Sequence, residues 1–388
     1  MLHEHKQFTP EQSGEIFEQL PSSAAVFALR GDPGSEPYVG KSSNLKRRLT
    51  RLLGEPDPNS KRLNLRQQCR TIEFTQTGSD FESWFLLYSV LHSEFPKTYR
   101  DKIKLRLAPL IKLNLENPYP RAYVTRRIAS LRSPSLYFGP FPSRTMAEKF
   151  LNDSLDFFKM RRCDFNLNPD PAFPGCIYSE MKMCLAPCFK GCTDEEYRHE
   201  VGRVQAYFDS SGSSLVREIS NHRDQASQEL KFEDAAALHA KTEKVKSLLT
   251  ISNLPELAKP LSQLSGVIVQ RSHQENSVAL FRLDHGYISG PLAFRIEPTS
   301  DRSKSMESRV MEALGAEAHA ASAAELNEHI AILKRWYYRG RRTGEVFLCD
   351  QRGELPLRRI VRGIGRVYRG ETDSVSPDST AAAIEPVN

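Results

Sequence analysis

The sequence contains no long apolar stretch. None of its runs approaches the ~18 consecutive apolar residues that a membrane-spanning helix needs. The first ten residues carry two histidines, a glutamate and a lysine, whereas a secretory signal has an apolar core and a transit peptide is rich in arginine. We therefore expect a cytoplasmic protein that neither spans a membrane nor carries a targeting leader.

Cys-x2-Cys pairs, which are common in zinc sites, are also absent. Seven cysteines are present nonetheless, and five of them lie within thirty residues, separated by 12, 7, 3 and 3 residues. Because the cytoplasm keeps thiols reduced, this density predicts a metal centre rather than a disulfide framework. Cys69 and Cys349 stand apart, and we interpret them as small buried apolar residues. The clustered residues are Cys163, Cys176, Cys184, Cys188 and Cys192.

The net charge of +6 is small, but it is unevenly distributed. Residues 40–72 contain nine basic side chains against two acidic ones, and residues 97–132 contain ten against two. Clustered lysines and arginines neutralise nucleic-acid phosphates and release their counterions. The charge alone is equally compatible with an ordinary solvated surface.

The first hundred residues predict a small domain of mixed strands and helices. After a short polar leader, strands are expected at 24–30, 37–40 and 71–75. Ser43 or Asn44 is a candidate cap for a basic helix through Leu53, and Ser79 with Glu82 opens an apolar helix that Pro96 limits.

The whole pattern predicts the α/β (α+β) class. The lack of proline and glycine from 214 to 252 indicates two antiparallel helices joined at Lys231. The expected regions are an α/β domain at 14–100, a basic linker and cysteine region at 101–212, a helix hairpin at 213–252, an α/β region at 260–370 and a disordered tail at 371–388.

Four features together resemble a known family. They are Ala24-Ala-Val-Phe27 followed by Tyr38-Val-Gly-Lys-Ser-Ser-Asn-Leu-Lys-Arg-Arg-Leu49, Tyr137-Phe-Gly-Pro-Phe-Pro-Ser143, the cysteine spacing, and Glu229-Leu-Lys-Phe-Glu-Asp-Ala-Ala-Ala-Leu238. The first domain resembles the GIY-YIG nuclease fold, and the order of segments is similar to the amino-terminal half of UvrC, the incision subunit of bacterial nucleotide-excision repair. The resemblance implies a truncated relative that lacks the RNase H-like nuclease and the helix-hairpin-helix domains.

The resemblance assigns catalytic roles to Tyr38, Lys41 and Arg48, with Gly40 allowing a close backbone turn. Two matching positions are degenerate, because Phe27 replaces the first tyrosine and Leu87 replaces the metal-binding glutamate. Tyr99 stands where asparagine is usual. An aliphatic side chain cannot bind a divalent cation, and neither Glu82 nor Glu94 on the same predicted helix is placed to substitute for it.

We therefore expect a DNA-binding domain with doubtful metal binding at the nuclease site. The expected DNA-binding residues are Lys41, Lys46, Arg47 and Arg51. The alternatives are an active structure-specific endonuclease with an unorthodox metal site, and an iron–sulfur DNA-binding regulator outside repair.

The family resemblance also gives the cysteines a role. It implies that Cys163, Cys176, Cys184 and Cys188 hold a [4Fe–4S] cluster, with Cys192 as an extra residue. A structural zinc ion and unligated buried cysteines remain the alternatives.

The helix hairpin carries a short apolar stripe. By resemblance it pairs with the carboxy-terminal hairpin of a UvrB-like partner, through Leu230, Phe232, Ala236 and Leu238. In place of the usual Arg-Asp pair after the stripe, the chain has His239-Ala240. The alternative is a hairpin packed within the chain on residues 264–340.

Residues 260–370 offer few candidate ligands. We interpret Asp284, His285, Asp301 and Asp350 as turn and surface residues, since their spacing assembles no two-metal site. Further arginines could contact nucleic acid, at Arg339, Arg341, Arg342, Arg358, Arg359, Arg362 and Arg366.

Overall fold

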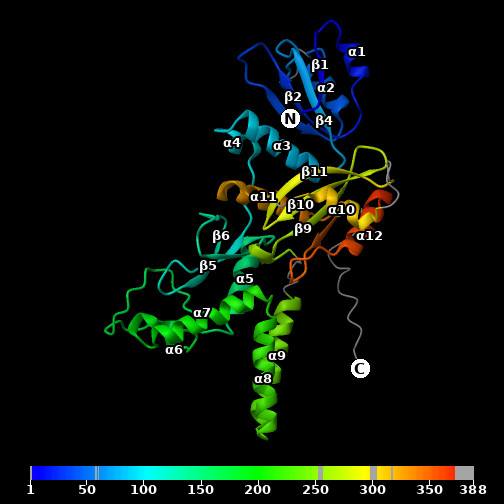
Figure 1. Ribbon diagram of the computed structural model, residues 1–388. Helices are drawn as coiled ribbons and strands as arrows, with labels where there is room; N and C mark the ends of the chain where they lie inside the picture. Colours follow the sequence, from blue (N-terminus) through cyan, green and yellow to red (C-terminus); the bar gives the residue numbers. More distant parts are fainter. Residues whose placement is uncertain are drawn as a thin grey trace.

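The computed structural model describes residues 2–56, 59, 61–251, 257–297, 304–315 and 318–371. Three four-stranded antiparallel sheets organise these residues, together with helices packed on their faces. The predicted α/β (α+β) class is confirmed. Figure 1 shows the first sheet at one end of the molecule, the last sheet in the middle, and a helix hairpin extending from the opposite end. The predicted disordered tail falls, from residue 372 onward, outside the described residues.

The first sheet belongs to the amino-terminal domain. Its strand order is β1 (Glu4–Gln7), β4 (Thr71–Gln76), β2 (Ala25–Arg30) and β3 (Tyr38–Ser42). Helices α1 (Ser13–Glu18) and α2 (Leu45–Leu53) cover one face, and α3 (Asp80–Glu94) covers the other. Leu45, Leu49 and Leu53 of α2 are fully buried against the sheet.

Helix caps form where the sequence predicts them. The Asn44 side chain accepts a hydrogen bond from the Arg47 amide at the start of α2, and the Ser79 side chain accepts one from the Glu82 amide at the start of α3. Each bond satisfies an amide that would otherwise lack an intrahelical partner.

The second sheet and the cysteines form the middle of the chain. The sheet order is β6 (Arg121–Thr125), β5 (Leu110–Asn114), β7 (Leu136–Gly139) and β8 (Lys259–Pro260). Helices α5 (Arg144–Leu155) and α7 (Asp194–Asp209) share its apolar core. The cysteine segment, residues 159–193, lies between these helices and contains the short elements α6 (Ile177–Glu180) and η1 (Pro187–Phe189).

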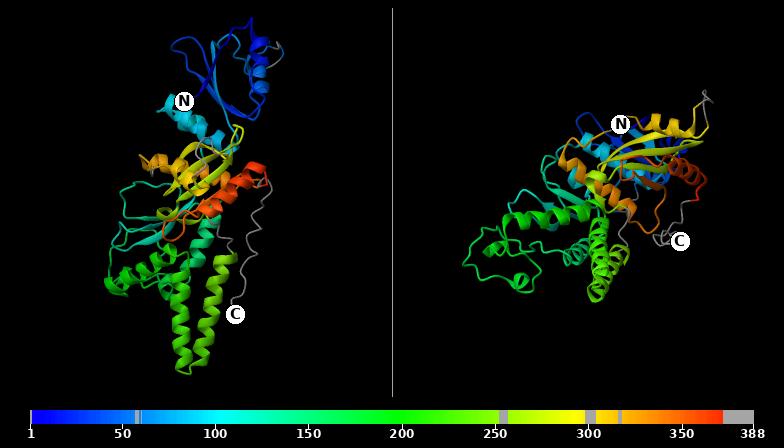
Figure 2. Two further views of the ribbon diagram at one scale, coloured as in Figure 1. Left: turned by 45° about the vertical axis from the view of Figure 1, so that its right-hand side comes forward. Right: turned by 60° about the horizontal axis from the view of Figure 1, so that its bottom comes forward.

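The helix hairpin consists of α8 (Ser213–Gln228) and α9 (Phe232–Ile251). Its base packs on α5 and α7 through Leu215, Ile219 and Val245. The rest of the hairpin extends away from the body of the molecule in every view (Figures 1 and 2).

The third sheet has helices on both faces. Its strands are β11 (Tyr287–Arg295), β10 (Ser277–Asp284), β9 (Gly266–Arg271) and β12 (Glu345–Leu348), and η2 (Leu261–Gln263) precedes them in the chain. One face packs on α10 (Met306–Leu314) and α12 (Leu357–Arg369). The other face packs on α11 (Ala323–Tyr337) and on α3.

Helix α3 joins the first and third sheets. Val90 packs on the first sheet, whereas Phe81 and Phe85 contact Phe281 of the third sheet, with ring centroids 4.9 and 5.8 Å apart. Helix α4 (Tyr99–Ile103) follows the carboxy-terminal end of α3. The hydroxyl of Tyr99, its first residue, donates a hydrogen bond to the buried Glu328 carboxylate of α11 at 2.9 Å. The amino-terminal domain is therefore anchored to the carboxy-terminal region through a large aromatic core.

Two parts of the fold differ from the sequence-based expectation. Residues 4–7, predicted as a polar leader, form the edge strand β1, because an edge strand with one neighbour can keep polar side chains. Residues 101–143, predicted as a linker, contain β5, β6 and β7, whose buried Leu110, Ile111 and Leu113 supply a core.

None of the helices in the described ranges is long and apolar enough to cross a membrane.

Candidate functional site

Tyr38 and Arg48 meet on the α2 side of the first sheet. The Arg48 guanidinium donates a hydrogen bond to the Tyr38 hydroxyl at 2.9 Å. The fully buried Phe27 ring lies 6.2 Å from the Tyr38 ring. A Cβ atom at Gly40 would lie only 3.2 Å from the Phe27 ring, so the glycine leaves room for this packing.

Lys41 lies on the opposite face of the same sheet. Side chains alternate along a strand, and Val39, which shares the Lys41 side, packs in the apolar cluster under α3. The Lys41 ammonium is 2.5 Å from an Asp80 carboxylate oxygen and 4.8 Å from the centre of the Trp84 ring. The structure therefore brings Tyr38 and Arg48 together but directs Lys41 toward α3.

Asp80 connects Lys41 to the carboxy-terminal region. Its second carboxylate oxygen accepts a hydrogen bond from Arg339 at 2.5 Å. Arg335, on α11, stacks over the Trp84 ring with its guanidinium carbon 4.0 Å from the ring centre. Both oxygens of Asp80 are thus occupied by cations, and Lys41 already has an anionic partner.

Leu87, at the position of the family glutamate, lies in an apolar layer. It is half-buried and belongs to the cluster between α3 and the sheet, which also contains Val26, Val39 and Val90. Among the described residues, no group of three or more potential metal ligands lies near Tyr38 or Arg48. Tyr99, the other departure from the family pattern, contacts Glu328 instead.

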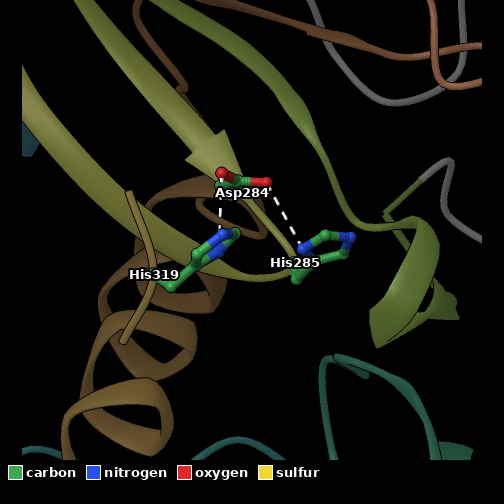
Figure 3. A group of neighbouring side chains, drawn as sticks. All are labelled: Asp284, His285 and His319. Carbon is green, nitrogen blue, oxygen red and sulfur yellow. Dashed lines mark ion pairs between the residues drawn. The ribbon is translucent and has the colours of Figure 1, made fainter. Parts of the chain in front are cut away.

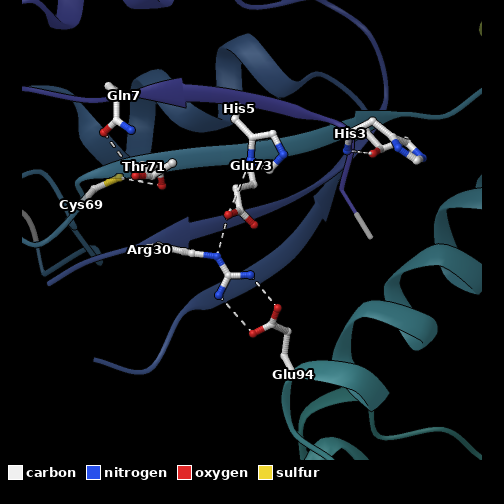
Figure 4. A network of polar contacts seen from close by, with 9 residues as sticks. His3, His5, Gln7, Arg30, Cys69, Thr71, Glu73 and Glu94 are labelled. Atoms are coloured by element: carbon white, nitrogen blue, oxygen red, sulfur yellow. Dashed lines mark hydrogen bonds and ion pairs between the residues drawn. The ribbon is translucent and has the colours of Figure 1, made fainter. Parts of the chain in front are cut away.

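The two neighbouring glutamates of α3 are engaged elsewhere. Glu82 accepts a hydrogen bond from the Gly78 amide at 2.8 Å, and burial raises the pKa of its carboxyl to about 7. Glu94 forms a bidentate ion pair with Arg30, in which the two guanidinium nitrogens Nη2 and Nη1 lie 2.5 and 3.1 Å from the carboxylate oxygens (Figure 4). The hydrogen bonds from Arg30 lower the pKa of Glu94. Neither carboxylate is therefore available to act as the metal ligand that the family resemblance places at the position of Leu87.

The exposed face of α2 is basic. Lys46, Arg47 and Arg51 point away from the leucine face of this helix and form no salt bridge with any acidic residue that the structure describes. Unpaired cations on one helix face attract the phosphates of nucleic acid. The expected DNA-binding set is therefore split, with these three residues on α2 and Lys41 on the other side of the sheet.

The cysteine segment gathers its thiols in irregular backbone. Ala186 and Lys190, which flank Cys188, both have positive φ angles of 57° and 59°. Burial, and after it the neighbouring thiols of Cys163, Cys188 and Cys176, raise the pKa of Cys184 to about 11. The four predicted ligands thus lie close enough to influence one another.

Two hydrogen bonds are directed at the sulfur atoms. The Ala186 amide donates to the Cys184 sulfur at 3.3 Å, and the buried Arg161 guanidinium donates to the Cys163 sulfur at 3.5 Å. Such donors stabilise thiolates and tune metal-bound sulfur. No three of the thiols lie within 4.8 Å of one another, whereas a single zinc ion with bonds of 2.3 Å holds its sulfurs about 3.8 Å apart.

Two of the four predicted partner-binding residues lie at the free end of the hairpin. Leu230 and Phe232 are 72% and 65% exposed, Ala236 is exposed and Leu238 is half-buried near the core of the middle domain. The alternative of a hairpin packed on residues 264–340 is wrong for these tip residues. A positive φ at Leu230 forms the turn between the helices.

Sequence reasoning missed the contacts that Asp80, Trp84, Arg335 and Arg339 make around Lys41. Asp80 and Arg339 are separated by 259 positions, so no local pattern joins them. The one sequence signal for these contacts was Trp84, which lies five residues after the Ser79 cap and is one of only two tryptophans in the chain.

Part of the chain matches a known protein family. Residues 108–207 match the family model described as "UvrC/Cho excinuclease, middle domain". The chain is 28% identical over 239 residues to UvrABC system protein C of Idiomarina loihiensis, covering 60% of this chain and 37% of that protein. It is 25% identical over 295 residues to the protein of the same name from Methanothermobacter thermautotrophicus, covering 75% and 48%. No solved structure matches the chain.

The matched segment contains the second sheet and the cysteine segment, and the alignments to full proteins extend well beyond it. Residues 108–207 therefore form a domain of the UvrC/Cho middle-domain type. The chain is similar to proteins of the UvrC family. It spans less than half the length of these curated relatives.

Proposed function

We propose that the chain is a UvrC-like DNA-binding factor of nucleotide-excision repair in the cytoplasm, with a GIY-YIG-like domain that binds DNA without cutting it. The observation that carries this proposal is the Tyr38–Arg48 pair, beside which no group of three potential metal ligands lies among the described residues, while Leu87 packs in an apolar layer on the opposite face of the sheet. Hydrolysis of a phosphodiester needs an activated water and stabilisation of charge on the phosphate, and a metal ion normally supplies part of both.

The remaining polar residues support binding better than catalysis. Tyr38 and Arg48 are hydrogen-bonded to each other, and no group of three potential metal ligands lies beside them in the described part of the chain. Arg48 keeps further guanidinium donors for a phosphate oxygen, and the basic face of α2 extends the same surface. Positioning of the DNA backbone therefore needs no metal ion.

A cleavage and binding assay tests this proposal. Single-turnover incubation with a nicked or bubble-containing duplex and Mg²⁺ or Mn²⁺ is expected to give salt-dependent binding and no incision. The triple variant Lys46→Ala, Arg47→Ala, Arg51→Ala should reduce the slope of log affinity against log salt by about 3. The control is the triple variant Lys241→Ala, Lys244→Ala, Lys246→Ala, which removes the same charge from α9. It should change the slope of log affinity against log salt little.

Metal-dependent incision that is lost in Arg48→Ala would contradict the binding role and support the active endonuclease instead. Normal resistance of a deletion strain to ultraviolet damage would remove the protein from repair and support the regulatory alternative.

The cysteine segment supports a [4Fe–4S] cluster held by Cys163, Cys176, Cys184 and Cys188. The wide spacing of the thiols favours a cluster over one zinc ion, because each thiolate then binds a different iron. Bound there, the cluster would supply a rigid cross-link within the segment. The Ala186 amide and the Arg161 guanidinium would hold two of the sulfurs in place. Brown protein with about four irons per chain supports this centre, and colourless protein with one zinc contradicts it.

The hairpin tip supports docking of a UvrB-like partner. Exposed Leu230 and Phe232 at the end of a projecting arm are suited to insertion between partner helices. Co-purification with UvrB is expected for the wild-type chain and for Tyr368→Ala, which removes an exposed aromatic side chain from α12. The Phe232→Ala variant should no longer co-purify with UvrB, and retention of the partner by this variant would contradict the proposed docking site.

A further inference from the structure

Asp284, His285 and His319 meet beside the third sheet. Asp284 is the last residue of β10, His285 follows it in the turn to β11, and His319 lies shortly before α11 (Figure 3). One ligand atom from each residue lies within 4.8 Å of the others. The interpretation of Asp284 as a turn or surface residue is wrong, because this side chain is only 4% exposed. Asp301 lies outside the described residues.

The Asp284 carboxylate lacks the hydrogen bonds that a buried carboxylate needs. Its Oδ2 atom is buried and has no hydrogen-bond partner in the part of the chain that is described. The His285 Nδ1 atom is 3.3 Å from Oδ1, and the His319 Nδ1 atom is 3.8 Å from Oδ2. These separations exceed the 2.7–3.2 Å of ordinary N–H···O hydrogen bonds.

The same separations suit donors that share one ion. Two ligand atoms bound tetrahedrally to zinc at about 2.0–2.1 Å lie about 3.3 Å apart. Imidazole nitrogen and carboxylate oxygen are ligands that zinc accepts readily, whereas magnesium prefers oxygen alone. We propose that Asp284, His285 and His319 form a binding site for a divalent transition-metal ion of the zinc type.

The surrounding structure holds the ligands in place. His285 has a φ angle of 48°, and its amide donates to the Ser265 hydroxyl at 2.9 Å. A Cβ atom at Gly286 would lie 3.2–3.3 Å from Ile330 and Leu326, so the turn packs directly on α11. Both imidazoles are more than half exposed, which leaves an open position for water or another ligand.

Bound there, the ion would tie the β10–β11 turn to the residues that lead into α11. Helix α11 carries Glu328 and Arg335, and Arg339 lies two residues after its end. These three side chains contact α4, α3 and Asp80. The site would therefore reinforce the anchoring of the amino-terminal domain. This role is independent of the cysteine segment and of the DNA-binding proposal.

Zinc binding by the purified full chain tests the proposal. Equilibrium dialysis against zinc chloride followed by metal analysis should give one more zinc per chain for the wild type than for His285→Asn or His319→Asn. Each substitution should weaken this binding at least about tenfold, since loss of outer-shell partners alone costs about 10- to 100-fold. Asparagine is chosen because it tolerates the positive φ at His285.

The control is His222→Asn, which removes an exposed histidine from α8. It should bind zinc as the wild type does, and zinc should raise the thermal midpoint of both proteins but not of the two site variants. Equal midpoints of all four proteins in EDTA establish that the variants fold. Equal zinc binding by wild type and both site variants, or no zinc binding by the wild type, would overturn the proposal.

Discussion

In the amino-terminal domain the carboxylates of α3 are bound by protein cations or backbone amides. In the cysteine segment, by contrast, four thiols lie close enough to raise the pKa of Cys184. The first arrangement is complete without a ligand. The second gathers four thiols, a ligand type that zinc and iron–sulfur clusters accept, in one short segment. The contrast teaches that a metal-site proposal should rest on the ligand groups that the fold gathers rather than on overall similarity to a metalloenzyme.

The largest expected effect concerns the cysteine segment. The double variant Cys184→Ser, Cys188→Ser removes two converging thiols, and we expect loss of the metal centre and rapid proteolysis within residues 159–193. Binding energy at a structural metal centre acts as folding energy, about 10 kcal/mol or more for structural zinc. Metal analysis and limited proteolysis measure both outcomes. Cys192→Ser is the matched control and should retain the centre, while an unchanged metal content in the double variant would remove the contrast.

The second prediction concerns Glu82, the acidic residue nearest to the missing ligand. Burial raises the pKa of Glu82 from 4.5 to about 7 in the folded chain. The folded state therefore favours the protonated carboxyl, and its contribution to stability is full below pH 4.5 and is lost as the pH rises through about 7. The shift of about 2.5 pKa units corresponds to about 3 kcal/mol.

Urea unfolding followed by tryptophan fluorescence measures this effect. Trp84 lies two residues from Glu82, and Trp336 contacts Phe81 of the same helix, so both tryptophans report on α3. Between pH 4.5 and 7, the unfolding free energy of wild type relative to Glu82→Gln should fall by about 3 kcal/mol. A pH-independent difference would show that Glu82 is ionised in the folded chain and free to act as a ligand.

Local elements could be predicted from the sequence because their signals are local. Helix α2 has a capping asparagine and buried leucines at helical spacing, and the α8–α9 hairpin lacks proline and glycine. The β5–β7 strands escaped prediction because each has only four or five residues and basic or proline residues surround them. Their stability comes from packing against α5 and α7, which the sequence pattern does not display.

The candidate sites could likewise be predicted only where their residues lie close together in the sequence. Tyr38 and Arg48 are ten positions apart in one motif, and the structure joins these two side chains. Lys41 lies in the same motif, but strand alternation directs it to the other face. His319 is 34 positions from His285 and carries no motif, so only the folded arrangement brings it to Asp284.

The third prediction places a carboxylate at the degenerate position. Leu87→Glu puts an ionisable group in an apolar layer, and we expect a loss of about 2 kcal/mol in unfolding free energy. We expect no incision, because Phe27 lacks a hydroxyl and Lys41 stays paired with Asp80. Leu87→Gln matches the shape without the charge. Mg²⁺-dependent cutting by Leu87→Glu alone would mean that a single residue separates this domain from an active nuclease.

The smallest expected effect concerns the pairing of Lys41. Asp80→Asn should change stability by less than about 1 kcal/mol, because the pair is partly exposed to solvent. Release of the Lys41 ammonium should strengthen DNA binding about two- to fivefold and steepen the dependence of log affinity on log salt by about 1. Fluorescence anisotropy with a labelled duplex measures both quantities. Asp32→Asn removes the same charge from the Asp32–Arg70 pair of this domain, so an equal gain there would assign the effect to net charge rather than to Lys41.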